Sequence, residues 1–121
     1  MVTPSGASSD PARGDAPTGG AGGPSISTHV LDAGRGEPAV GVRVELYRGG
    51  TRLASSVTNA DGRISALVPG PLVRGTYRLV FAVPSSFISR LEVEFTVTDP
   101  DRHYHIPLLV SPFACTTYRG S

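Results

Sequence analysis

The three histidines of the chain are the residues best suited to metal or acid–base chemistry. His103 and His105 stand two positions apart, and the third is His29. Side chains alternate between faces in a strand, so a strand here would place His103 and His105 on one side. With His29 as a third ligand they could hold zinc, although no carboxylate or thiol at ligand spacing completes the set. The more common role of such a pair is hydrogen bonding in a polar face of a sheet.

The same histidines could instead activate water for hydrolysis. A neutral imidazole acts as a general base effectively only where the developing oxyanion is stabilised by another group. Arg63 follows the Asp61-Gly62 turn directly, and its guanidinium offers a fixed charge in a planar fork. The same position also suits a solvated surface arginine, so both interpretations stay open.

Other nucleophiles are scarce. All eleven basic residues are arginines, which excludes a lysine nucleophile or a lysine Schiff base. The single cysteine, Cys115, cannot form an internal disulfide, and a role as a buried, small apolar residue is favoured over a reactive thiol. Ser111 and Ser121 lack the Gly-x-Ser-x-Gly elbow of hydrolases.

Composition narrows the classes of partner and location. The net charge of +1 gives no electrostatic case for binding nucleic acid or an anionic membrane surface. No signal-peptide pattern is visible, and no run approaches the roughly 18 apolar residues of a membrane span. We therefore expect a cytoplasmic protein that binds neither nucleic acid nor membrane.

The chain divides into a tail and one domain. Residues 1–24 consist mostly of Gly, Ser, Pro, Ala, Asp and Thr, which predicts a disordered Gly/Ser/Pro-rich tail. The glycine run within it is not a phosphate-binding loop, because neither a strand nor a helix is predicted beside it. Residues 25–121 are expected to form one β domain.

Short apolar runs separated by turn residues predict about eight strands in that domain and no amphipathic helix. In residues 40–47 (VGVRVELY), an apolar side chain occupies every second position, as in a half-buried strand. Together the runs indicate an all-β sandwich. The expected strands are residues 26–32, 40–47, 51–58, 63–68, 77–83, 91–97, 103–110 and 113–118.

Four separated motifs resemble the 5-hydroxyisourate hydrolase family, the transthyretin-related enzymes of urate breakdown. They are STHVLD at 27–32, TNADGR at 58–63, HYHIPLL at 103–109 and YRGS at 118–121. The resemblance spans residues 26–121, with the motifs in the order that the family shows.

The resemblance implies a transthyretin-like (prealbumin-like) sandwich of two four-stranded sheets, assembled as a homotetramer with active sites in a channel between dimers. It assigns catalysis to His29, Arg63 and His105, with Tyr118 and Ser121 as further substrate contacts. The implied reaction is hydrolysis of the cyclic amide of 5-hydroxyisourate to 2-oxo-4-hydroxy-4-carboxy-5-ureidoimidazoline. This chemistry needs no metal or organic cofactor.

The chain departs from the family at two places. Between Phe81 and Leu91 it is shorter by about ten residues, in a segment that usually holds a short helix and a Phe-Phe-Pro element. In the last strand, Cys115 stands where the family tends to have a tyrosine at a subunit interface, which removes apolar contact area. Neither change touches the expected catalytic groups.

Two other functions fit the same sequence. A non-catalytic transthyretin-like carrier would bind a planar ligand in the channel without turning it over. A structural β-sandwich would be a monomer, and changes at His29, Arg63 or His105 would not affect its role.

Overall fold

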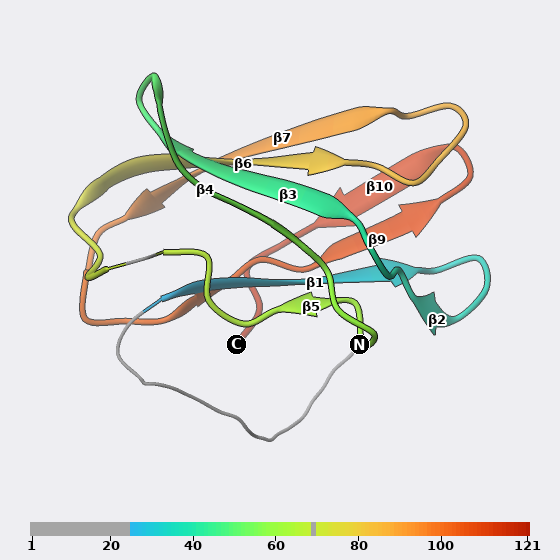
Figure 1. Ribbon diagram of the computed structural model, residues 1–121, viewed down its shortest axis with the longest axis horizontal. Coiled ribbons are helices and arrows are strands. Elements are labelled where there is room, and N and C mark those ends of the chain that lie inside the picture. Colours follow the sequence, from blue (N-terminus) through green and yellow to red (C-terminus); the bar gives the residue numbers. More distant parts are fainter. Residues whose placement is uncertain (1–24, 69) are drawn as a thin grey trace.

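The computed structural model describes residues 25–68 and 70–121, so the expected tail at residues 1–24 lies outside the described residues. The described part contains ten strands and no helix, and accordingly no helix able to cross a membrane. The strands form two layers that pack face to face (Figure 1). The expected all-β, transthyretin-like sandwich is confirmed.

One layer is a four-stranded antiparallel sheet with the order β4-β3-β6-β7. Gly49 has a φ of 61° in the turn between β3 and β4, a left-handed conformation that glycine adopts without strain. The strands are β3 (Arg43–Arg48), β4 (Thr51–Val57), β6 (Gly75–Ala82) and β7 (Arg90–Val97).

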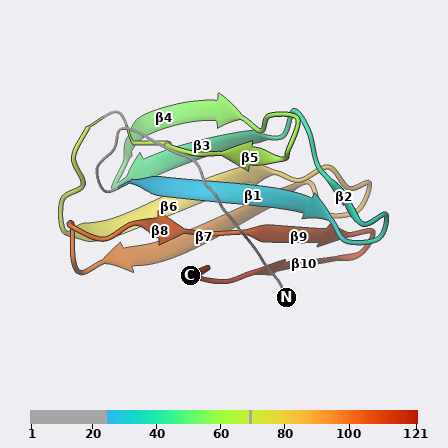
Figure 2. The same cartoon turned by 90° about the horizontal axis from the view of Figure 1, so that it is seen from below.

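The other layer is built around β1 (Ile26–Asp32), which lies side by side with strands from distant parts of the chain (Figure 2). Its main path runs β10-β9-β1-β2, and the short strands β5 and β8 also pair with β1. The remaining strands are β2 (Glu37–Pro38), β5 (Arg63–Ile64), β8 (Tyr104–His105), β9 (Leu108–Ser111) and β10 (Ala114–Thr117).

Three expected strands differ from the structure in their extent. The strand expected at 103–110 is two strands, β8 and β9, because Pro107 between them has no N–H group to donate to the ladder. The strand expected at 63–68 ends at Ile64. The strand expected from Val40 begins only at Arg43, and Val40 lies in an exposed turn.

Alternating apolar residues of both sheets meet in one core. From β3, Val44 and Leu46 are fully buried, and Phe81 and Leu79 of β6 lie beside them as their partners in the same sheet. The inner face of the other sheet contributes Ile26, Val30, Leu108 and Val110 to the same cluster.

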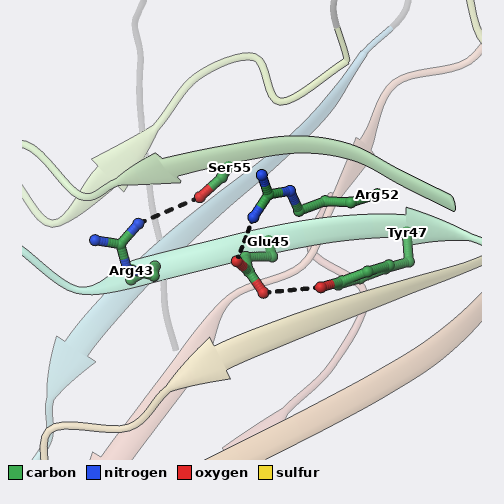
Figure 3. A network of polar contacts seen from close by, with 5 residues as sticks. All are labelled: Arg43, Glu45, Tyr47, Arg52 and Ser55. Carbon is green, nitrogen blue, oxygen red and sulfur yellow. Dashed lines mark hydrogen bonds and ion pairs between the residues drawn. The ribbon is translucent and has the colours of Figure 1, made fainter.

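The outer face of the β3-containing sheet is polar, which explains the period of two in its sequence (Figure 3). Glu45 accepts hydrogen bonds from Arg52 and from the Tyr47 hydroxyl, both at 3.1 Å. Arg43 contacts the Ser55 hydroxyl at 3.4 Å. These contacts are on the surface and contribute little to stability individually.

The shortened segment between β6 and β7 forms a closed loop. The Val83 N–H donates to the Ser89 carbonyl at 3.0 Å, and Val83 is buried while Ile88 packs against the core. The Ser85 hydroxyl donates to the Pro112 carbonyl at 2.8 Å, which ties this loop to the β9–β10 turn. The short loop therefore covers this end of the core with its own side chains.

Replacing Val44 by Ala should reduce the free energy of unfolding by about 2 kcal/mol, from two lost methyl groups and the cavity that they leave. Val40→Ala is the matched control, because Val40 is 62% exposed whereas Val44 is completely buried. That control should change stability by no more than about 0.5 kcal/mol. Chemical denaturation measures both variants, and equal losses would contradict the assignment of the core.

Candidate functional site

The central strand β1 brings the expected site residues onto one face of its sheet. On one side, β5 pairs antiparallel with β1 and places Arg63 directly opposite His29. On the other side, β8 pairs parallel with β1 and places His105 opposite Ser27. Because Ser27 and His29 are two residues apart, their side chains share a face, and Arg63 and His105 join them there.

The Asn59–Gly62 turn fixes the start of β5. The Asn59 side-chain oxygen accepts hydrogen bonds from the backbone N–H groups of Asp61 and Arg63, at 2.9 and 3.0 Å. Gly62 has a φ of 75°, and a Cβ there would lie 2.5 Å from the Val30 carbonyl oxygen. A glycine is therefore required for Arg63 to enter its position beside β1.

His29 is held by this same turn. Its Nε2 lies 2.9 Å from the Asp61 carbonyl oxygen. A carbonyl can only accept a hydrogen bond, so Nε2 carries the proton and Nδ1 of the neutral ring is free to accept one. Burial, and then the charge of Arg63, lower the pKa of His29, while the contact with Asp61 raises it less.

His105 lies deeper than His29 and shares a partner with His103. The Ser27 hydroxyl oxygen is 2.8 Å from Nδ1 of His105 and 2.7 Å from Nε2 of His103. The side-chain hydroxyl of Thr28, on the opposite face of β1, donates to the Ile106 carbonyl at 2.6 Å. These contacts fix β8 against β1 on both faces of the sheet.

The electrostatic environment keeps these imidazoles neutral at physiological pH. Burial lowers the pKa of His105 to about 4, with further lowering by the charges of Arg63, His103 and His29. Partial burial also lowers the pKa of His103. Arg63 itself forms no ion pair with any residue of 25–68 or 70–121. A fixed cation, without an ion pair among these residues, therefore lies beside imidazoles that can accept protons.

The C-terminal segment returns to cover His105. The Gly120 N–H donates to the His105 carbonyl at 2.7 Å, and the two residues form an isolated bridge. A Cβ on Gly120 would lie 2.6 Å from Cδ2 of the His105 ring, so only glycine allows this close approach. Ser121 follows immediately and is exposed.

Tyr118 lies at a different hollow within the single chain. This hollow, of about 220 Å³, is at the open edge of the sandwich and contains none of the three histidines and no part of Arg63. Arg119 stacks over the Tyr104 ring there, 4.6 Å from its centroid. The lining residues are Val93, Phe95, Thr96, Tyr104, Ile106, Thr117, Tyr118 and Arg119.

Two further expectations concern Cys115 and metal binding. Cys115 is half-buried on β10 and packs against the core. Burial raises the pKa of its thiol, so the side chain behaves as a small apolar residue. Among the residues that the structure describes, no group of three or more His, Cys, Asp or Glu side chains is placed to hold a metal ion. His103 and His105 instead share the Ser27 hydroxyl.

The structure thus brings His29, Arg63 and His105 together and adds two residues that the sequence analysis did not single out. Ser27 was visible as the residue two positions before His29, which is the spacing of a shared strand face. Gly120 was part of the C-terminal motif, but its approach to His105 depends on a contact between segments distant in sequence.

Comparisons with known proteins agree on one family. The model of the HIUase/Transthyretin family matches residues 26–120. The 5-hydroxyisourate hydrolase of Deinococcus radiodurans is 44% identical over 115 residues, covering 81% of this chain and 97% of the relative.

Solved structures support the same grouping. Klebsiella pneumoniae 5-hydroxyisourate hydrolase superposes with a TM-score of 0.73 at 40% identity, covering 79% of this chain and 98% of the other. Sea bream transthyretin, solved with thyroxine, gives a TM-score of 0.70 at 31% identity and covers 78% and 93%. The chain therefore belongs to the HIUase/transthyretin family.

Proposed function

We infer that the chain hydrolyses 5-hydroxyisourate, opening its cyclic amide to give 2-oxo-4-hydroxy-4-carboxy-5-ureidoimidazoline in urate degradation. The observation that carries this inference is the pair of neutral imidazoles, His29 and His105, beside the guanidinium of Arg63. Relatives about 40% identical to this chain carry the name 5-hydroxyisourate hydrolase, which supports the same activity.

Hydrolysis of a cyclic amide makes three demands on a site. Water must lose a proton as it attacks the carbonyl carbon, the oxygen of the tetrahedral intermediate must be stabilised, and the leaving nitrogen must gain a proton. Two imidazoles and one guanidinium meet these demands without a metal or an organic cofactor.

We assign the proton transfers to His29 and His105 and the oxyanion to Arg63. His29 can accept a proton at Nδ1, because its Nε2 proton is committed to the Asp61 carbonyl. Arg63 lowers the basicity of both rings in the resting protein. As negative charge develops on the carbonyl oxygen, it offsets the charge of Arg63 and makes protonation of the imidazoles more favourable.

We further propose that the active molecule is a homotetramer. In the single chain, His103, Arg63 and Ser121 are exposed, and Tyr118 is 46% exposed. A second subunit facing this surface would close the site into a channel and exclude water. Tyr118 and Ser121 would then become substrate contacts, and the cytoplasmic location stays a prediction.

Arg63→Ala and His105→Asn should each lower kcat/KM for 5-hydroxyisourate by about 10²- to 10⁴-fold, through loss of the oxyanion donor or of a general base. The measurement is the decay of ultraviolet absorbance of substrate generated from urate in situ. Arg48→Ala is the matched control, because Arg48 is exposed on β3 in the opposite sheet. Wild-type rates in either site variant would contradict the assignment, and binding without turnover by the wild type would indicate a carrier.

The pH dependence of the site follows from the low pKa of His105. Because the folded pKa of about 4 lies below the ordinary 6.5, His105 stays neutral as pH falls through 6.5 and becomes protonated only near 4. A two-dimensional NMR titration of the wild-type imidazole signals should show this, and a transition near 6.5 would contradict it. In Arg63→Ala the pKa of His105 should rise, because the second largest cause of its lowering is removed.

The proposed assembly has a direct test. Size-exclusion chromatography with light scattering should give four times the 12.6 kDa of one chain across a range of concentrations. A stable monomer with full activity would contradict a channel formed between subunits. A dimer would show that this chain, with Cys115 in its last strand, has lost one of the two interfaces.

A further inference from the structure

The hydroxyl of Ser27 joins two histidines in a way that the proposed reaction does not yet use. Ser27 is buried on β1, with its oxygen 2.7 Å from Nε2 of His103 and 2.8 Å from Nδ1 of His105. A serine hydroxyl has one proton to donate, so it cannot donate to both rings. At least one ring must therefore donate its N–H to Ser27, which can pass its own proton to the other ring, and the direction of these hydrogen bonds fixes the tautomers of both rings.

The backbone holds the three groups at these positions. Ser27 and His105 are direct partners in the parallel pairing of β1 and β8. The Tyr104 N–H donates to the Ser25 carbonyl and the Ile106 N–H to the Ser27 carbonyl, both at 2.9 Å. The rings are therefore aligned on Ser27 by the sheet itself.

The charge of Arg63 favours one direction of this chain of hydrogen bonds. The charged and titratable groups that lower the pKa of His105 are Arg63 on β5, His103 and His29 on β1. Gly120 lies against the ring. Nδ1 of His105 contacts Ser27, so Nε2 is the nitrogen left to face the reaction. A lone pair on Nε2 interacts favourably with a nearby cation, whereas an N–H group there would be repelled.

We propose that Ser27 and His103 are positioning residues that hold His105 with its proton on Nδ1, leaving Nε2 free to accept a proton from the attacking water. In this arrangement His105 Nδ1–H donates to Ser27, and the Ser27 hydroxyl donates to Nε2 of His103. His103, an exposed residue, then carries its proton on Nδ1.

This arrangement also stabilises the protonated form of His105. When Nε2 gains a proton, the ring becomes an imidazolium and its Nδ1–H becomes a stronger donor to Ser27. Because Ser27 donates to His103 at the same time, its oxygen is a better acceptor. These linked hydrogen bonds therefore offset part of the free-energy cost that the charge of Arg63 imposes on a protonated His105. This consequence depends on the proposed hydrolysis, whereas the tautomer of His105 does not.

The decisive experiment is nitrogen-15 NMR of the imidazole groups in the intact protein near pH 7, with the His105 signals assigned by their absence in His105→Asn. We expect a protonated Nδ1 and an unprotonated Nε2 in the wild type. Ser27→Ala should give averaged signals from both tautomers, and Ser27→Thr, which keeps the hydroxyl, should restore the single form. A wild-type His105 protonated on Nε2, or an unchanged tautomer in Ser27→Ala, would overturn the proposal.

His103 gives a second pair of variants that does not disturb the buried Ser27. His103→Gln keeps an amide near the position of Nε2 that can accept from Ser27, whereas His103→Leu removes the acceptor. Only the leucine variant should give the mixed tautomer. If neither variant changes the His105 signals, His103 has no part in positioning.

Activity measurements separate this proposal from the proposed function. Ser27→Ala and His103→Leu should lower kcat for 5-hydroxyisourate by on the order of 10- to 100-fold, the range for groups that orient a metal-bound imidazole, with KM little changed. An equal loss in Ser27→Thr and Ser27→Ala would indicate only a packing role. An inactive wild type with the expected tautomer would reject the hydrolase function and leave the positioning intact.

Discussion

The pairing of β1 with a strand on each side is the constraint on which the site depends. The antiparallel register to β5 sets Arg63 against His29, and the parallel register to β8 sets His105 against Ser27. A shift of either partner by one residue would turn its side chain to the core face. Fully buried Ile26, Thr28 and Val30 on the inner face of β1 make such a shift costly, so the core and the site share one register.

The two strands that flank β1 at the site are short, and local contacts compensate for their length. β5 and β8 have two residues each, too few to define a position by ladder hydrogen bonds alone. The Asn59 side chain and the positive φ of Gly62 hold the first, and the Thr28 hydroxyl holds the second. Substitutions in these supports would therefore move the functional groups while leaving the sandwich in place.

The electrostatic character of the face arises from one cation and partial burial. Burial removes water that would stabilise imidazolium, and Arg63 adds repulsion, so the histidines remain neutral. A neutral imidazole of low pKa is a weak base in isolation, and it becomes effective when the same cation stabilises the charge that its proton transfer creates. Arg63 thus determines both the resting state of the bases and the energy of the intermediate.

Part of the site could be predicted from residue types alone. The period of two predicted the strands, and motif resemblance selected His29, Arg63 and His105 as a group. Pro107 is a residue that interrupts the hydrogen bonding of a strand, and it could be read from the sequence. One continuous strand was nevertheless expected there, because apolar residues continue on both sides of Pro107. Ser27 was marked only by its spacing from His29, because a serine in a strand is ordinary until its neighbours across the sheet are known.

The sequence by itself determined the alternation of buried and exposed side chains, the turn at Asn59–Gly62, and the chemical types available for catalysis. These depend on local backbone preferences and on covalent chemistry, which short segments carry with them. Only the tertiary structure decided that His103 and His105 meet one hydroxyl, that Gly120 lies on the His105 ring, and that Tyr118 faces a separate hollow. The contacts of Ser27 join residues 76 and 78 positions apart, and the others involve the C-terminal segment. They depend on how distant strands align when they pack together, which a single segment of sequence does not determine.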